Sequence, residues 1–155
     1  MEYMMELRKL VGQRPLIMVG ATMLLINRQN ELLMIKRTDN LFWGVPGGSI
    51  ELGETLEECV RRETLEEVGI HVDQMELFGI YSGEELHYIY PNGDEVFMIS
   101  AVYLSRIDNE PIILDLNEHS AYQFFKLNEI PEDVSPPIKP FLRDLITNFK
   151  DPVHA

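Results

Sequence analysis

The segment from residue 55 to residue 69 is the part of the sequence that most limits the fold. Thr55 followed by Glu58 matches the capping box that begins a helix, and Gly69 matches the glycine that ends one. The sequence therefore predicts a helix from about Leu56 to Val68. At 100° per residue, Cys59 lies within about 60° of Leu56, so an apolar stripe begins normally on this helix.

Two turns later, the same face bears acidic residues where a core-facing helix would have Leu, Ile or Val. They are Glu63, Glu66 and Glu67. The last two stand at the negative end of the helix dipole, and the first and third repel each other as an i,i+4 pair. Such local violations are expected at functional sites, where a bound cation offsets the repulsion. We therefore predict a metal site on this face rather than a solvated surface.

Composition narrows the choice of metal and of partner. Asp and Glu number 26 against 13 Lys and Arg, a net charge of −13, so we expect neither polymer nucleic acid nor an anionic membrane surface as a partner. A phosphate-bearing small molecule would need a cation as mediator. Carboxylate oxygens suit Mg²⁺ or Mn²⁺. The only cysteine is Cys59, and we find no metal-ligand spacing among His71, His87, His119 and His154.

The chain of 155 residues has the length of one domain, and we expect a single domain over 1–155. The most apolar stretch, 15–26, has twelve residues and is too short to span a bilayer as a helix. With one cysteine, no intrachain disulfide can form, which favours the reducing cytoplasm.

The remaining pattern favours strands over helices. We expect strands near 16–26, 31–37, 75–83, 85–90, 96–107 and 121–127, with a loop and one short strand in 42–54. A short helix is expected near 3–11. A last helix, after the proline-rich stretch 129–140, presents on one face Phe141, Leu142, Leu145, Ile146 and Phe149. This order predicts a mixed, mostly antiparallel sheet with helices on its faces, an α/β or α+β arrangement.

The run GGSIELGETLEECVRRETLEEVGI resembles the signature of the Nudix (MutT-like) hydrolases. The matching positions are Gly48, Glu54, Arg62, Glu63, Glu66, Glu67, Gly69 and Ile70. Thr64 departs from the aliphatic residue usual there, and we expect it to alter helix packing rather than chemistry. LFWGVPGG and FFKLNEIP also resemble the family, so the likeness extends over most of the chain.

This resemblance implies a Nudix-type α/β/α sandwich that hydrolyses a nucleoside diphosphate linked to another group. Substrates of this class include nucleoside triphosphates, nucleotide sugars, ADP-ribose and dinucleoside polyphosphates. It implies one to three Mg²⁺ or Mn²⁺ ions, held by the Gly48 carbonyl and by Glu63, Glu66 and Glu67. The base that orients the water is a signature glutamate, Glu63 first, or a loop glutamate, of which Glu118 ranks before Glu95, Glu84 and Glu85.

Other residues receive supporting assignments. We expect Glu54 and Arg62 to form a structural ion pair away from the three carboxylates. Trp43 either stacks on a nucleobase or packs in the core. Tyr88 and Tyr90 either border the leaving-group pocket or cover the sheet edge. Arg37 is a candidate phosphate ligand, together with Arg14 and Lys36.

Two alternatives to the hydrolase stay open. The chain is either an enzyme or a catalytically silent nucleotide-binding or sensor module of the same fold, although such a binder has no need of all three glutamates. A prenyl diphosphate isomerase would need a cysteine in the pocket, and Cys59 is expected to be an inert core thiol. The subfamily marks we looked for are absent or weak, since Glu85 stands where ADP-ribose hydrolases often have proline. A homodimer through Met4, Met5 and Leu7 is possible on this sequence.

Overall fold

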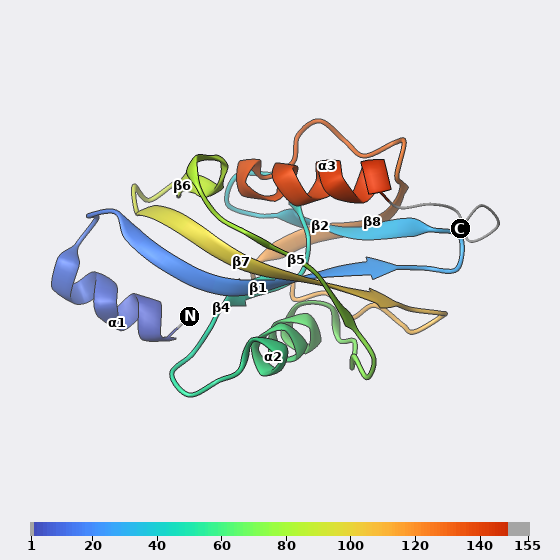
Figure 1. Ribbon diagram of the computed structural model, residues 1–155, viewed down its shortest axis with the longest axis horizontal. Coiled ribbons are helices and arrows are strands. Elements are labelled where there is room, and N and C mark those ends of the chain that lie inside the picture. Colours follow the sequence, from blue (N-terminus) through green and yellow to red (C-terminus); the bar gives the residue numbers. More distant parts are fainter. Residues whose placement is uncertain (1, 149–155) are drawn as a thin grey trace.

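The computed structural model describes residues 2–148, which form three α-helices packed around one eight-stranded sheet (Figure 1). In chain order the elements are α1 (Glu2–Val11), β1 (Leu16–Ile26), β2 (Glu31–Arg37), β3 (Trp43–Gly44), β4 (Gly47–Ser49), α2 (Leu56–Val68), β5 (Glu76–Tyr81), β6 (His87–Ile89), β7 (Glu95–Arg106), β8 (His119–Lys126) and α3 (Lys139–Asn148). One-turn 3₁₀ helices span Glu84–Leu86 and Pro136–Ile138.

The sheet is mixed and mostly antiparallel, which confirms the predicted fold class. Its main order is β3-β2-β1-β7-β5, with β4 on β1, β6 on β7 and β8 on β2. Only the long central pair β1 and β7 is parallel among the described strands, in register from Leu16 opposite Val96 to Ile26 opposite Arg106.

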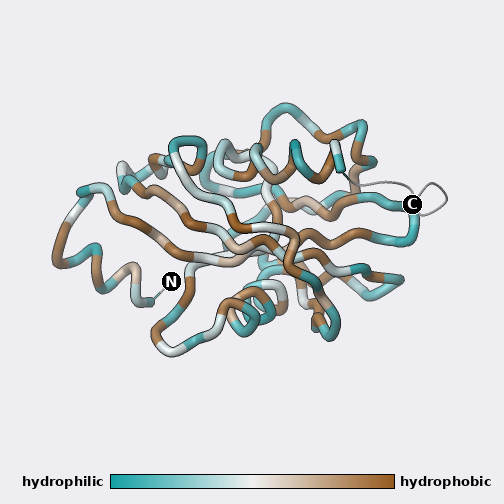
Figure 2. The backbone as a smooth tube through the Cα atoms, in the orientation of Figure 1, coloured by the Kyte–Doolittle hydropathy of each residue, from teal (hydrophilic) through white to brown (hydrophobic). Residues whose placement is uncertain are grey.

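Helices cover both faces of the sheet, with α2 on one side and α3 on the other (Figure 1). Met23 and Leu25 of β1 belong to the core under α2, whereas Leu24 and Ile26 belong to the core under α3. Both faces are buried over residues 23–26, which are therefore all apolar, whereas Ile17 and Val19 nearer the start of β1 are exposed. Hydrophobic residues accordingly follow the central strands, and hydrophilic ones gather at the turns (Figure 2).

Strands β1 and β2 separate from each other in the middle of the sheet. β1 and β2 pair at a single register position, Ile26 with Leu32, and beyond it the segment 43–49 pairs with both of them. This close approach needs glycine, because a Cβ on Gly20 would lie 2.5 Å from the Gly48 carbonyl oxygen. The division places Gly47 and Gly48 beneath α2, in the middle of the sheet.

Both predicted ends of α2 are confirmed. The Thr55 side chain accepts the Glu58 amide at 3.1 Å, the Glu58 carboxylate accepts the Thr55 amide at 3.4 Å, and Gly69 is left-handed with φ of 73°. Beyond the helix, a later loop satisfies two of its last carbonyls. Ile113 donates its amide to the Val68 carbonyl, and Asp115 does the same for Glu67, each at 2.9 Å.

A few elements differ from the sequence prediction. The expected strand 85–90 begins as a 3₁₀ turn and contains only the short β6. The glycine-rich segment forms two short strands rather than one. In α3, Phe141, Leu142 and Leu145 are buried as expected, but Ile146 is exposed, and Phe149 lies outside the described residues. In residues 2–148, no helix has the length and apolar character to cross a membrane.

Candidate active site

The signature glutamates of α2 do not share one environment. Glu63 and Glu67 are each 7% exposed and face β4, whereas the Glu66 side chain is 57% exposed. Thr64 and Val68 are fully buried and continue the core-facing stripe. The expectation that all three carboxylates replace the core is therefore wrong for Glu66, which lies at the edge of the buried arc.

Gly48 makes room for Glu63. A Cβ on Gly48 would lie 2.4 Å from the carboxylate carbon and from Oε1 of Glu63, so any larger residue would displace that carboxylate. The Gly48 carbonyl is also 3.6 Å from the Cys59 Sγ atom. The predicted ligands Gly48 and Glu63 are thus neighbours in space, although fifteen positions separate them in the sequence.

Glu67 is a buried carboxylate whose one hydrogen-bond donor among residues 2–148 is the Gly47 amide, 2.8 Å from its Oε2. Burial raises the pKa of Glu67 well above its ordinary value, and the nearby Glu63 and Glu118 carboxylates add to this effect. The Gly47 amide and the Arg37 guanidinium oppose it. A negative charge at this position is therefore compensated only in part by the described protein groups.

Arg62 forms ion pairs with Glu54 and with Glu63 at the same time. It binds Glu54 through Nε at 2.6 Å and Nη2 at 2.9 Å, and this pairing lowers the pKa of Glu54 to about 2. Its Nη1 atom also donates to Oε1 of Glu63 at 2.8 Å and lies 3.6 Å from Glu66. The ion pair is present as expected, but its predicted location away from the carboxylates is wrong, because one guanidinium bridges both groups.

The loop that caps α2 brings Glu118 and His119 to the end of the helix. Ligand atoms of Glu67, Glu118 and His119 all lie within 4.8 Å of one another. The other loop glutamates considered from the sequence lie elsewhere: Glu95 binds His87 and Glu85 binds Arg143, at 2.7 and 2.6 Å. Glu84 is exposed outside the site.

His119 is a site residue that the sequence analysis did not select. It is 4% exposed, and burial lowers its pKa, which favours the neutral ring. Its Nδ1 atom is buried without a hydrogen-bond partner among the described residues. Its position directly after the candidate Glu118 could have indicated it. A search limited to His-His and Cys-His spacings overlooks a histidine that lies among carboxylates.

Two adjoining cavities form the cleft. The carboxylate cavity, of about 500 Å³, is lined by Glu63, Glu66, Glu67 and Glu118 among others. The aromatic cavity, of about 150 Å³, is lined by Tyr88, Tyr90, Ile138 and His119 among others. Both are bordered by Met18, Arg37, Gly47, Gly48, Glu67 and Tyr90. The cleft is acidic on one side and largely apolar on the other.

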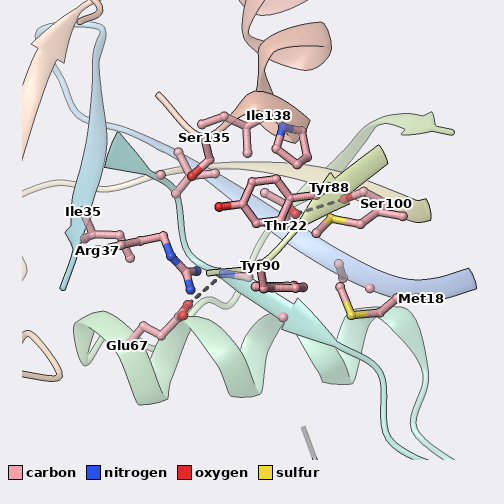
Figure 3. A pocket seen from close by; sticks show the side chains of 18 of the residues that line it. Met18, Thr22, Ile35, Arg37, Glu67, Tyr88, Tyr90, Ser100, Ser135 and Ile138 are labelled. Carbon is pink, nitrogen blue, oxygen red and sulfur yellow. Dashed lines mark hydrogen bonds between the residues drawn. The ribbon is translucent and has the colours of Figure 1, made fainter. Parts of the chain in front are cut away.

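The residues between and around these cavities lie as Figure 3 shows, with the Arg37 and Glu67 side chains pointing toward each other. Arg37 donates to Asp39 through Nε and Nη2, at 2.8 and 2.6 Å, which leaves Nη1 for another acceptor. Tyr88 accepts a hydrogen bond from Asn40 at 2.6 Å and packs edge-on against Tyr90. Both tyrosines therefore border the cavity, which favours the pocket interpretation over a simple cover for the sheet edge.

Trp43 is partly buried against the core, whereas Cys59 lies within it. Trp43 makes an edge-on contact with Phe125, at 5.1 Å between ring centroids, in the core under α3, and it is absent from the described lining of both cavities. The geometry thus favours the packing alternative, and base stacking by Trp43 stays a prediction. Cys59 is fully buried, and burial raises the pKa of its thiol to about 12.

Comparison with known proteins agrees with this architecture. Residues 16–145 match the family model of the NUDIX domain. The chain is 35% identical over 111 residues to the ADP-ribose pyrophosphatase of Methanocaldococcus jannaschii, which covers 70% of this chain and 62% of that protein. It is 32% identical over 108 residues to the NAD-capped RNA hydrolase NudC of Vibrio parahaemolyticus, covering 68% of this chain and 38% of that one. The chain therefore spans less than two thirds of these relatives.

Solved structures show the same fold. A MutT NUDIX hydrolase from Burkholderia pseudomallei superposes with a TM-score of 0.69 at 25% identity, covering 82% of this chain and 96% of that one. A MutT protein from Methanosarcina mazei Go1 superposes with a TM-score of 0.72 at 23% identity, covering 89% and 99%.

Proposed function

The chain belongs to the Nudix hydrolase family, and from this membership we propose that it is a divalent-metal-dependent pyrophosphohydrolase. Its substrate is a nucleoside diphosphate linked to another group, and the bond cleaved is a phosphoanhydride. The observation that supports this most is the buried and only partly compensated Glu67 carboxylate, which accepts the Gly47 amide and lines both cavities.

The residues of the carboxylate cavity fit a divalent cation. Two glutamates are buried there, Glu67 has a single donor, and the missing side chain of Gly48 leaves space that a carboxylate occupies. We assign the cation to the Gly48 carbonyl with Glu67 and Glu66, and Glu63 borders the same position. A bound Mg²⁺ or Mn²⁺ would polarise the phosphoryl group, lower the pKa of a bound water and offset the repulsion between acidic site and anionic substrate.

We assign the proton-accepting role to Glu63. Arg62 binds its Oε1 and favours the ionised form, against the burial that raises the pKa of this carboxyl. Its second oxygen remains for the proton of the attacking water. Arg62 therefore acts as a positioning residue, since it touches Glu63 rather than the substrate.

We assign the phosphate groups of the substrate to the carboxylate cavity and its organic moiety to the aromatic cavity. Phosphate groups fit the acidic side through the cation and through the free Nη1 of Arg37, which is the cationic donor at the boundary. An organic moiety fits the aromatic side, where Tyr88 and Tyr90 present ring surfaces. Because the relatives include proteins named as an ADP-ribose pyrophosphatase and a NAD-capped RNA hydrolase, ADP-ribose and NAD belong among the first compounds to test.

The expected partner is the free small molecule rather than polymer nucleic acid. The net charge of −13 supports this, since it opposes long phosphate chains. Action in the cytoplasm agrees with a lone cysteine that is buried and unpaired.

Hydrolysis of a mixed panel tests the proposed function. The panel contains nucleoside triphosphates, nucleotide sugars, ADP-ribose, NAD and dinucleoside polyphosphates, and products are resolved by mass. Each reaction is run with Mg²⁺, with chelator, and with Glu67→Gln in place of the wild type. Glu57→Gln is the matched control, because Glu57 is exposed on the same helix and its contact with the Tyr103 hydroxyl tolerates an amide oxygen.

We expect cleavage at a phosphoanhydride that requires metal and is lost in Glu67→Gln but not in Glu57→Gln. Turnover that persists in chelator, or in Glu67→Gln, would contradict the proposal. If nucleotides bind without turnover, the sensor module becomes the better explanation.

A further inference from the structure

Three donor groups lie together in the cleft, and one of them is a nitrogen. The ligand atoms of Glu67, Glu118 and His119 lie within 4.8 Å of one another. Metal–ligand bonds of about 2.1 Å place two ligands of one ion at most about 4.2 Å apart, so these side chains need to move by less than about 1 Å to share an ion.

His119 is the independent observation that points to a ligand. It is buried to more than nine tenths, it lines the aromatic cavity, and its Nδ1 atom has no hydrogen-bond partner among residues 2–148. Buried polar atoms are nearly always satisfied, so an orphaned nitrogen on an imidazole ring that lies close to two carboxylates requires an explanation. A bound cation supplies the missing partner.

Backbone hydrogen bonds hold the segment that carries Glu118 and His119. Its amide donates to the Asp115 carbonyl at 3.0 Å, and the Glu118 carbonyl accepts the Thr38 amide, also at 3.0 Å. Asp115 in turn donates to the carbonyl of Glu67 itself. The loop and the helix terminus thus form one hydrogen-bonded unit, in which all three donors are tied to the same short stretch of backbone.

A β-bulge determines which face His119 occupies. In the β2–β8 pairing, Lys36 is opposite Ala121, but the next residue, Arg37, is opposite His119, so Ser120 is the extra residue. Directly opposed residues point to the same face of a sheet. The bulge therefore places His119 on the Arg37 side, where Glu67 lies, whereas regular alternation would have placed it with Ala121 on the other side.

We propose that Glu67, Glu118 and His119 form a mixed nitrogen and oxygen site that binds a divalent transition metal in preference to Mg²⁺. Imidazole is a poor ligand for Mg²⁺, which takes oxygen donors, and a good one for transition ions. This nitrogen and oxygen site rests on the proposed function in one respect, because both require that Glu67 binds a metal ion. The new element is that one metal position selects a transition ion over Mg²⁺ through the His119 nitrogen.

The charge balance around the three donors permits such an ion. Arg37 lies nearby, but Asp39 holds it by two hydrogen bonds and offsets its charge. Glu67 and Glu118 offset the charge of a divalent ion, while the neighbouring Glu63 is paired with Arg62; Glu67 and His119 are buried and Glu118 is exposed.

Pulsed EPR of bound Mn²⁺ tests this site without any measurement of turnover. Electron spin-echo modulation detects a ¹⁴N nucleus that is directly bound to Mn²⁺. The wild type, His119→Phe and His119→Asn are compared, with the exposed His71 as the matched control in His71→Gln. Titration calorimetry gives the Mn²⁺ and Mg²⁺ affinities of each protein, and circular dichroism of the metal-free variants establishes that they fold.

We expect a ¹⁴N modulation in the wild type and in His71→Gln, and none in either His119 variant. Mn²⁺ affinity at this site should fall about tenfold or more in His119→Phe, with Mg²⁺ affinity changed by less than about threefold. Modulation that persists in folded His119→Asn would overturn the assignment, as would Mn²⁺ binding to the wild type without modulation. If the wild type binds no divalent ion, the proposed metal dependence fails together with this site, whereas hydrolysis with Mg²⁺ and no ¹⁴N signal removes the nitrogen site alone.

Discussion

Replacing Arg62 with Gln should destabilise the metal-free protein far more than the loss of a surface ion pair. Arg62 pairs with Glu54 and Glu63, whose side chains are only 13% and 10% exposed. The lowering of the Glu54 pKa from 4.5 to about 2, with the Arg62 hydrogen bond as its largest cause, corresponds to about 3 kcal/mol. Because water screens the partly exposed guanidinium, we expect about 1–2 kcal/mol from it.

The second part of the cost comes from Glu63. Without Arg62, this buried carboxylate loses its donor at 2.8 Å, which adds about 1–2 kcal/mol. The free energy of unfolding should therefore fall by about 2–4 kcal/mol, and Tm by about 5–15 °C for a chain of this length. Thermal and urea unfolding in chelator measure both quantities.

Arg143→Gln is the matched control, because Arg143 pairs with Glu85 at 2.6 Å and both side chains are more than half exposed. That loss should cost less than about 1 kcal/mol. A double-mutant cycle of Arg62→Gln with Glu54→Gln should give a coupling energy of about 1–2 kcal/mol. Equal effects of the two arginine substitutions, or a coupling energy near zero, would refute the reasoning.

The same pair has a defined pH dependence. The pKa of Glu54 is lowered in the folded protein, so its contribution is complete above about pH 4.5 and is lost as the pH falls toward about 2. The difference in unfolding free energy between the wild type and Glu54→Gln should therefore shrink when urea unfolding is repeated at successively lower pH. A difference that stays constant through this range would assign the effect to packing instead.

Three further predictions concern the site itself. Glu67→Gln should raise the metal-free unfolding free energy at neutral pH by about 1 kcal/mol, because burial raises the pKa of Glu67 and so disfavours its charged form; a lower Tm in chelator would contradict this. Gly48→Ala should fold but bind Mn²⁺ about tenfold or more weakly in calorimetry, since the new Cβ displaces the Glu63 carboxylate; unchanged affinity would remove Gly48 and Glu63 from the centre. Cys59, with its thiol pKa raised to about 12, should resist alkylation at pH 8 until urea unfolds the chain, and rapid labelling of the native protein would exclude a buried thiol.

Local sequence determined much of the architecture. The capping box and Gly69 mark both ends of α2, and the continuous apolar runs mark β1 and β2, because these signals act between residues close in the chain. The 3.6-residue period also places Glu63 and Glu67 on one face. It could not show that Glu66 is exposed, because this depends on where the opposing strand β4 ends.

The proposed metal centre was only partly predictable from the sequence. Its helical glutamates and Gly48 follow from the signature pattern, but the bridge from Arg62 to Glu63 depends on how the side chains turn within a crowded space. Trp43 packs against the core under α3 because β3 pairs with β2. The residues around Trp43 in the sequence do not indicate that pairing.

The sequence alone determined the helix that carries two buried carboxylates and the glycine beside them, since periodicity and capping are short-range physics. Only the tertiary structure decided that Glu118 and His119 meet Glu67. That meeting needs a loop to dock on the last carbonyls of α2 and a bulge to turn one residue to the other face of β8. The loop and the helix end are about fifty residues apart in the chain, and the two strands that form the bulge are about eighty apart. The energies of such contacts depend on the packed fold and produce no periodic pattern in the sequence.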